Sequence, residues 1–139
     1  MSKEAITLEL DAERLREAQA IASASGQPAE PVLAEMLDEA IKMRRCPGIT
    51  FTDGPAGRRP VITGTGIELW TIIDAWKGGC QQDYTKLRET FHWLSDDQLR
   101  SALAYYELYP HDIDRWIERN NRAFEEFQRK YPQLVGPHT

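Results

Sequence analysis

The sequence has few residues of the kinds that bind metals or cross-link small proteins. Its 139 residues include two cysteines, Cys46 and Cys80, and three histidines that are scattered along the chain. Two cysteines are too few for a disulfide framework, and together with the histidines they match no metal-ligand spacing. We therefore expect two free thiols, no metal and no cofactor.

Long apolar runs and an excess of positive charge are also missing. No stretch approaches the ~20 apolar residues that a membrane helix needs, and the first five residues precede no secretory apolar run. We expect a cytoplasmic protein that makes no membrane contact. The chain has 17 basic and 22 acidic residues, a net charge of −5, so contact with nucleic acid would require a local basic patch.

Residues arranged for catalysis are absent from the sequence. There is no Gly-x-Ser-x-Gly elbow and no phosphate-binding loop, and the aspartates show no spacing typical of a divalent-metal site. Ser95 lies close to His92, but it is better explained as a helix cap because Gln98 follows three residues later. We expect a binding protein with no small-molecule substrate, not an enzyme.

The residues that are present predict a mainly α protein with minor β structure. The composition changes at Cys46, after which six glycines and prolines lie within residues 54–66. We therefore predict three parts: a dimerisation segment at 1–46, a hairpin and helical domain at 47–110, and an amphipathic helix with its tail at 111–139.

Residues 5–10 alternate between apolar and polar side chains, which predicts a half-buried strand. Helical spacing follows at residues 12–25, with Asp11 as the cap, and again after Pro28 and Pro31. A lone strand leaves its own backbone groups unpaired, which favours pairing with the same strand of a second chain. The predicted homodimer interface consists of Ile6, Leu8, Leu10, Leu33, Met36, Leu37 and Ile41.

This strand-helix-helix pattern, over about residues 3–45, resembles the ribbon-helix-helix family of bacterial regulators. The resemblance implies that the outward side chains of the ribbon enter the major groove of DNA, namely Lys3, Ala5, Thr7 and Glu9. Glu9 has the wrong sign for phosphate, and neither Ala5 nor Thr7 can make a bidentate contact with guanine. The alternative is a ribbon that only dimerises.

The second part begins with short apolar runs at 49–51 and 60–62 around turn residues, which predicts a hairpin with Arg58 and Arg59 beside its tip. Helices are expected at 67–77, 83–90 and 96–109. The last of these opens with a capping box at Ser95 and stops before Pro110.

Two motifs in this part, Gly-Arg-Arg-Pro-Val-Ile-Thr-Gly-Thr-Gly-Ile at 57–67 and Leu-Ser-Asp-Asp-Gln-Leu-Arg-Ser-Ala-Leu-Ala-Tyr-Tyr at 94–106, resemble the domain-of-unknown-function 433 family. The resemblance implies a winged or homeodomain-like helix-turn-helix fold, and an antitoxin that pairs with a PIN-like ribonuclease toxin. Gly66 departs from the family pattern, which usually has arginine there, so one candidate cation for DNA or toxin is missing.

In a helix-turn-helix interpretation, residues 83–90 support the recognition helix at 96–109. Asp96 and Asp97 would then lie beside phosphate with the wrong sign, whereas in a simple packing helix they complement the helix dipole. Both interpretations stay open. The candidate DNA contacts in this domain are Arg58, Arg59, Lys86, Arg88 and Arg100.

The last segment has apolar and aromatic residues at helical spacing from Ile113 to Tyr131. Such a stripe serves either as core or as a partner-binding surface, and the candidate partner contacts are Trp116, Phe124 and Phe127. Together these features lead us to expect an antitoxin and DNA-binding autoregulator that forms a homodimer and binds a ribonuclease toxin and operator DNA. The alternative is a dimeric protein–protein adaptor without DNA affinity.

Overall fold

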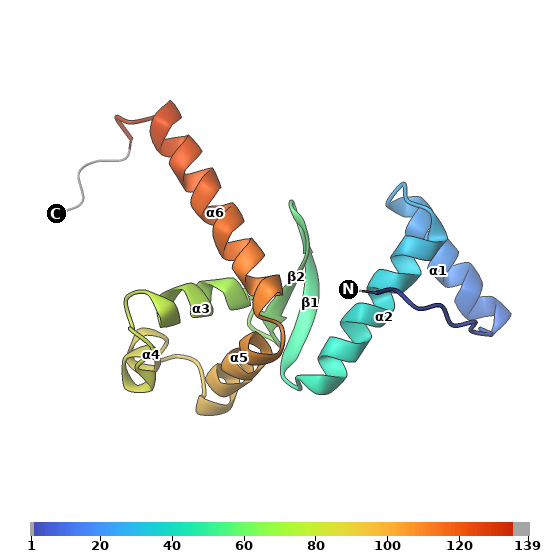
Figure 1. Ribbon diagram of the computed structural model, residues 1–139, viewed down its shortest axis with the longest axis horizontal. Helices are drawn as coiled ribbons and strands as arrows, with labels where there is room; N and C mark the ends of the chain where they lie inside the picture. The colour runs from blue at the N-terminus through green and yellow to red at the C-terminus, as the bar shows by residue number, and fades with distance from the viewer. Residues whose placement is uncertain (1, 135–139) are drawn as a thin grey trace. The chain divides into compact units, whose positions relative to one another are not determined.

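A computed structural model describes residues 2–134 of the chain (Figure 1). The described chain is mainly helical with one two-stranded antiparallel sheet, which confirms the predicted fold class. It divides into two compact units between Arg44 and Arg45. No helix within residues 2–134 combines the length and the apolar character required to cross a membrane.

The first unit contains α1 (Ala12–Ala24) and most of α2 (Ala29–Arg45), as predicted from the helical spacing. Asp11 stands at the N-cap position of α1, but its side chain makes no capping hydrogen bond. Gly26, with φ +70°, lies in the turn between the helices, where the left-handed conformation favours glycine. The predicted strand at 5–10 is not formed in the single chain. The sheet of the described chain contains only the two strands of the hairpin, and the partner expected for residues 5–10 was the same segment of a second copy.

Few apolar side chains are buried within the first unit. Ala18, Ala22 and Val32 are its buried hydrophobic residues, whereas Ile21 is 54% exposed. Two alanines and one valine provide little apolar area, although burial of such area is the main stabilising contribution in folding. The predicted apolar stripe of α1 is therefore only partly covered inside one chain.

The second unit opens with the hairpin of β1 (Ile49–Gly54) and β2 (Gly57–Ile62), where the sequence predicted one. The strands pair antiparallel from Ile49 opposite Ile62 to Gly54 opposite Gly57. Gly57 has φ +114°, which only glycine adopts without strain.

Four helices complete the second unit: α3 (Leu69–Lys77), α4 (Tyr84–Thr90), α5 (Asp96–Leu108) and α6 (Pro110–Lys130). The predicted capping box is present, because the Ser95 hydroxyl accepts from the Gln98 backbone and the Gln98 side chain accepts from the Ser95 backbone. Pro110 follows the end of α5, as predicted, and is itself the first residue of α6, where its missing N–H has no consequence.

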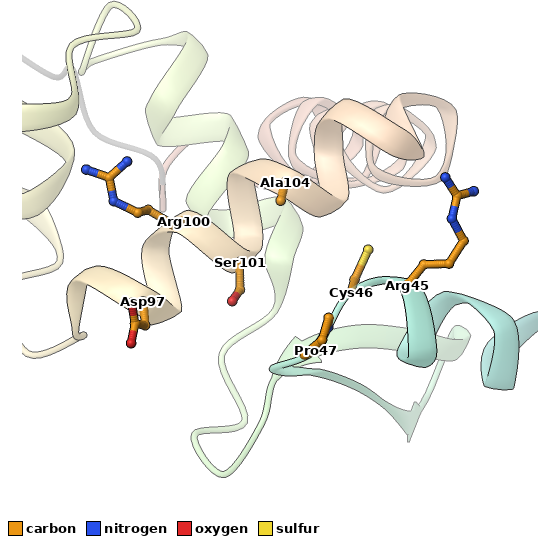
Figure 2. Close-up of a pocket in the computed structure, with 7 residues that line it drawn as sticks. All are labelled: Arg45, Cys46, Pro47, Asp97, Arg100, Ser101 and Ala104. Atoms are coloured by element: carbon orange, nitrogen blue, oxygen red, sulfur yellow. The ribbon is translucent and has the colours of Figure 1, made fainter.

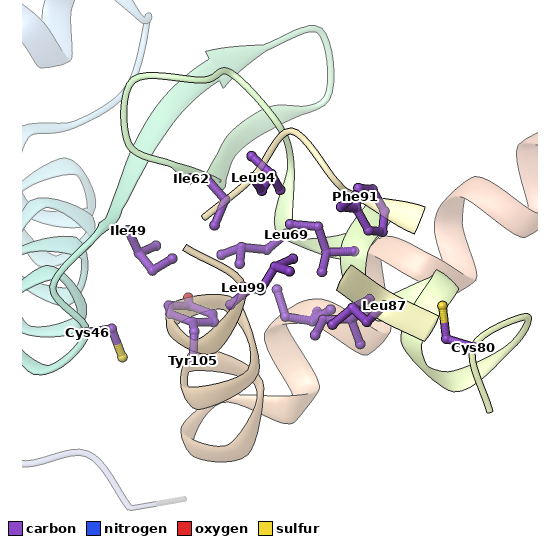
Figure 3. Packing of buried hydrophobic residues seen from close by; sticks show 14 residues of the cluster. Cys46, Ile49, Ile62, Leu69, Cys80, Leu87, Phe91, Leu94, Leu99 and Tyr105 are labelled. Carbon is purple, nitrogen blue, oxygen red and sulfur yellow. The ribbon is translucent and has the colours of Figure 1, made fainter. Parts of the chain in front are cut away.

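The core of the second unit gathers buried residues from the hairpin and all four helices (Figure 3). Tyr105 of α5 and Ile113 of α6 are fully buried in it. The Tyr105 hydroxyl donates to Asp112 at 3.0 Å, which joins α5 to the start of α6. The C-terminal helix, predicted as a part of its own, thus packs its first turns against α3 and α5 within this unit.

Candidate binding surfaces

An apolar hollow of about 420 Å³ lies in the first unit between the N-terminal segment and the helices. The structure brings together five of the seven predicted dimer residues along it. The lining residues are Leu8, Leu10, Leu15, Leu33, Met36, Leu37 and Ala40. Ile6 and Ile41, the other two predicted dimer residues, are 82% and 56% exposed and do not line the hollow.

The predicted DNA contacts of the N-terminal segment are exposed, as are all of residues 2–11. Lys3, Ala5, Thr7 and Glu9 are all exposed. They are therefore accessible to a ligand, although a carboxylate stands among them and the segment has no paired strand in the described single chain.

The two arginines near the hairpin tip interact with acidic side chains. Arg58 Nη1 lies 3.2 Å from Asp53 Oδ1, and Arg59 Nε lies 3.2 Å from Glu68 Oε1. Both partners of the second pair are mostly covered, with side-chain exposures of 27% and 23%. A phosphate would have to compete with these carboxylates, so this tip presents little net positive charge.

Three side chains from α4 and α5 form a small polar network. The Tyr84 hydroxyl donates to Asp96 Oδ1, the Arg100 Nε donates to Asp96 Oδ2 at 2.9 Å, and the Arg100 guanidinium lies 4.7 Å from the centre of the Tyr84 ring. The hydrogen bonds from Tyr84 and Arg100 hold the pKa of Asp96 below its usual value. Burial, followed by the hydrogen bond to Asp96, raises the pKa of Tyr84.

This network determines which predicted DNA contacts are available. Arg100 is engaged at the first turn of α5, so the cation expected to face bases is held by a neighbouring carboxylate. Lys86 and Arg88 are exposed on α4, and Lys86 Nζ contacts the Gln81 side chain at 3.4 Å. Lys86 and Arg88 are thus exposed cations of this pair of helices, whereas Arg100, although its side chain is 64% exposed, is paired with Asp96.

A more polar hollow of about 310 Å³ lies between the first turns of α5 and the segment that leads into β1 (Figure 2). Arg45 and Arg100 lie at opposite ends of it, with Cys46 between them. Burial raises the pKa of the Cys46 thiol, so the thiol stays protonated near neutral pH and is a poor nucleophile. Among the described residues, no group of three His, Cys, Asp or Glu is placed to hold a metal ion.

The second half of α6 carries the most exposed aromatic residues of that helix. Phe124 is 51% exposed and Phe127 is 44% exposed, and the Phe127 and Tyr131 ring centres lie 5.2 Å apart. Trp116, the third predicted partner contact, is half-buried, and the Arg119 guanidinium lies 5.6 Å from its ring centre. Arg119 also donates to the backbone oxygen of Ala56, which ties α6 to the hairpin tip.

One exposed aromatic residue, Trp93, was not among the predicted site residues. Trp93 is 60% exposed in the turn between α4 and α5, and its ring packs edge-on against His92 and Phe91. Its place between two helical segments, outside any apolar periodicity, is the only feature of the sequence that marks it as a surface residue.

Residues 49–106 match the family model described as "Protein of unknown function (DUF433)". This match confirms the resemblance that the sequence motifs suggested, and it covers the hairpin through most of α5. Neither a curated protein nor a solved structure matches the chain.

Proposed function

We propose that this chain, with its DUF433 segment at residues 49–106, is an antitoxin that forms a homodimer and binds a PIN-like ribonuclease toxin in the cytoplasm. The observation that carries the proposal is the uncovered aromatic surface on the second half of α6. Phe124 and Phe127 remain about half exposed on a helix whose first half is anchored in the core. Aromatic residues held rigidly at a surface are typical anchors of protein interfaces.

The first unit supports the homodimer in this proposal. Its exposed apolar residues include Leu8, Leu10, Leu37 and Ile41, while its buried hydrophobic residues are only two alanines and a valine. A second copy placed against the apolar hollow would pair the N-terminal segments and cover these side chains. Light scattering on the purified chain at micromolar concentration tests this, and a monomer would contradict it.

The toxin-binding part is tested with a purified PIN-like ribonuclease as the candidate toxin. The purified chain should inhibit RNA cleavage in stoichiometric amounts, and Phe124→Ala combined with Phe127→Ala should weaken inhibition. Loss of one interface anchor costs about 2 kcal/mol, which corresponds to ~30-fold weaker binding.

Glu118→Gln provides the matched control, because Glu118 lies on the same helix and is 69% exposed. It should leave inhibition unchanged. The proposal fails if the wild-type chain does not inhibit the ribonuclease, or if the control variant loses as much inhibition as the aromatic variants.

Operator binding is the second part of the proposed function. The exposure of Lys3 and Thr7 on the N-terminal segment and of Lys86 and Arg88 on α4 favours it. The pairing of Arg58, Arg59 and Arg100 with carboxylates opposes it, so we expect modest affinity with a strong dependence on salt.

Fluorescence anisotropy with DNA from upstream of the gene, a scrambled duplex and a salt titration tests the operator part. Lys86→Ala combined with Arg88→Ala should lower the salt slope by about 0.9 for each phosphate that these side chains neutralise. If neither duplex binds, the chain acts as the dimeric adaptor without DNA affinity.

A further inference from the structure

The apolar stripe of α6 has the spacing of a coiled-coil seam along its whole length. Alternating steps of four and three residues separate its members, as in a heptad repeat. Within α6 the seam consists of Ile113, Ile117, Asn120, Phe124 and Phe127, and the next position of the repeat is Tyr131, the C-cap residue that follows the helix.

The two halves of this seam have different surroundings. Ile113 is fully buried and Ile117 packs against the core, so the first half is covered by the second unit itself. Phe124, Phe127 and Tyr131 are 51%, 44% and 37% exposed, and Figure 1 shows the second half of α6 extending beyond α3 and α5. One continuous seam thus runs from the core of the second unit onto a surface that stays partly exposed in the single chain.

We propose that, when no toxin is bound, the exposed half of this seam pairs antiparallel with the same half of α6 in a second copy of the chain. The inference deepens the proposed function, because it assigns a competing occupant to the aromatic surface that the toxin would bind.

The residues of the exposed half complement each other in an antiparallel pair. When Phe124 lies opposite Phe127 of the second copy, the same register places Asn120 opposite Tyr131. The aromatic residues then meet at the centre. At each end the Asn120 Nδ2 donates to the Trp116 backbone oxygen at 2.8 Å, so the Asn120 Oδ1 is the atom that can accept from the phenol of the second copy. In this register apolar side chains of one copy face apolar side chains of the other, and polar groups face polar groups.

The positions beside the seam also fit this pairing. Asn121 and Gln128 flank one side, and Ala123 and Lys130 flank the other. In the antiparallel register Asn121 faces Gln128, and Ala123 faces Lys130, so no two like charges meet. The remaining charged residues of this half lie at the outward positions of the heptad: Glu118, Arg119, Arg122, Glu125, Glu126 and Arg129.

The short length of the exposed half makes the pairing weak. A stable interface buries about 800 Å² on each partner, which is more than a few helical turns supply. The contact is therefore reversible, and a toxin with more surface to offer can displace the second copy. Self-pairing would keep Phe124 and Phe127 covered until the toxin is present.

Chemical cross-linking of the full chain tests this geometry. The double variant Asn121→Cys with Gln128→Cys should yield a covalent dimer with a short bifunctional maleimide, because residue 121 faces residue 128 of the second copy. Each single variant should yield none. The wild-type chain gives the background of Cys46 and Cys80, which are 4% and 3% exposed.

Substitution at the centre of the seam provides the control. Phe124→Glu, or Phe127→Glu in a separate variant, should abolish the covalent dimer, and the outward Glu125→Gln should leave it unchanged. The pairing is refuted if the single variants cross-link as well as the double variant does, or if the double variant gives no more dimer than background.

An experiment with added ribonuclease tests the self-pairing and the toxin binding independently of each other. Addition of the ribonuclease should abolish the cross-link, and inhibition of the enzyme is measured independently. Inhibition without any cross-link in the free chain refutes the self-pairing alone, whereas a cross-link without inhibition refutes the toxin-binding proposal alone.

Discussion

Two alanine substitutions on α6 should have very different effects on the stability of the free chain. Ile113 is fully buried, with 0% of its surface accessible, so Ile113→Ala leaves a cavity against α3 and α5. Such a change costs about 2–5 kcal/mol of the free energy of unfolding. Phe124 is 51% exposed, so Phe124→Ala loses only part of one side chain's burial, about 1 kcal/mol or less.

Urea unfolding at low protein concentration measures both values. Tryptophan fluorescence reports on the second unit, because all four tryptophans, Trp70, Trp76, Trp93 and Trp116, lie in it. Low concentration keeps the α6 surface uncovered. Equal losses for the two variants would refute the division of α6 into an anchored half and an accessible half, and with it the basis for a docking surface there.

Three local features of the second unit lead to further expected outcomes. Ser95→Ala removes the hydroxyl that accepts from the Gln98 backbone and should lower the free energy of unfolding by about 1 kcal/mol in urea titrations. Gly57→Ala forces a side chain into φ +114° and should cost about 1–3 kcal/mol, measured as a lower thermal midpoint. The folded pKa of Asp96 lies below its unfolded value, so the network's stabilising effect is present above the unfolded value of about 3.8 and is lost as the pH falls through the folded pKa. Tyr84→Phe removes the hydrogen bond from Tyr84, which is the largest cause of the lowered Asp96 pKa, and should therefore raise the pH midpoint of Asp96 in an NMR titration. An unchanged midpoint would show that this hydrogen bond does not lower the pKa.

Local chemistry made the elements of the second unit predictable from the sequence. The capping box at Ser95, the turn residues around Gly57 and the proline at 110 each act over a few neighbouring residues, and the structure has an element boundary at every one of them. The aromatic spacing after Ile113 predicted α6 for the same reason.

The availability of the candidate residues depends on contacts between distant positions, which periodicity does not reveal. Arg59 meets Glu68 across nine residues, and Tyr84 meets Asp96 across twelve. The pairing of Arg100 with Asp96 is different, because residues four apart on a helix are neighbours and this contact could have been anticipated. The 54% exposure of Ile21 likewise could not be read from helical spacing, which placed this residue in the apolar stripe of α1.

Both units leave apolar side chains exposed at their surfaces. Each leaves apolar side chains uncovered on a chain whose net charge is −5: the first along its hollow of leucines, and the second along the outer half of α6. Negative charge disfavours phosphate as the ligand for these surfaces, and apolar area favours other proteins. The pairing of Arg58, Arg59 and Arg100 with carboxylates strengthens this preference, because it offsets the positive charge of three of the predicted DNA contacts. We therefore propose association with proteins as the primary activity, and DNA binding would depend on exposed cations such as Lys86 and Arg88.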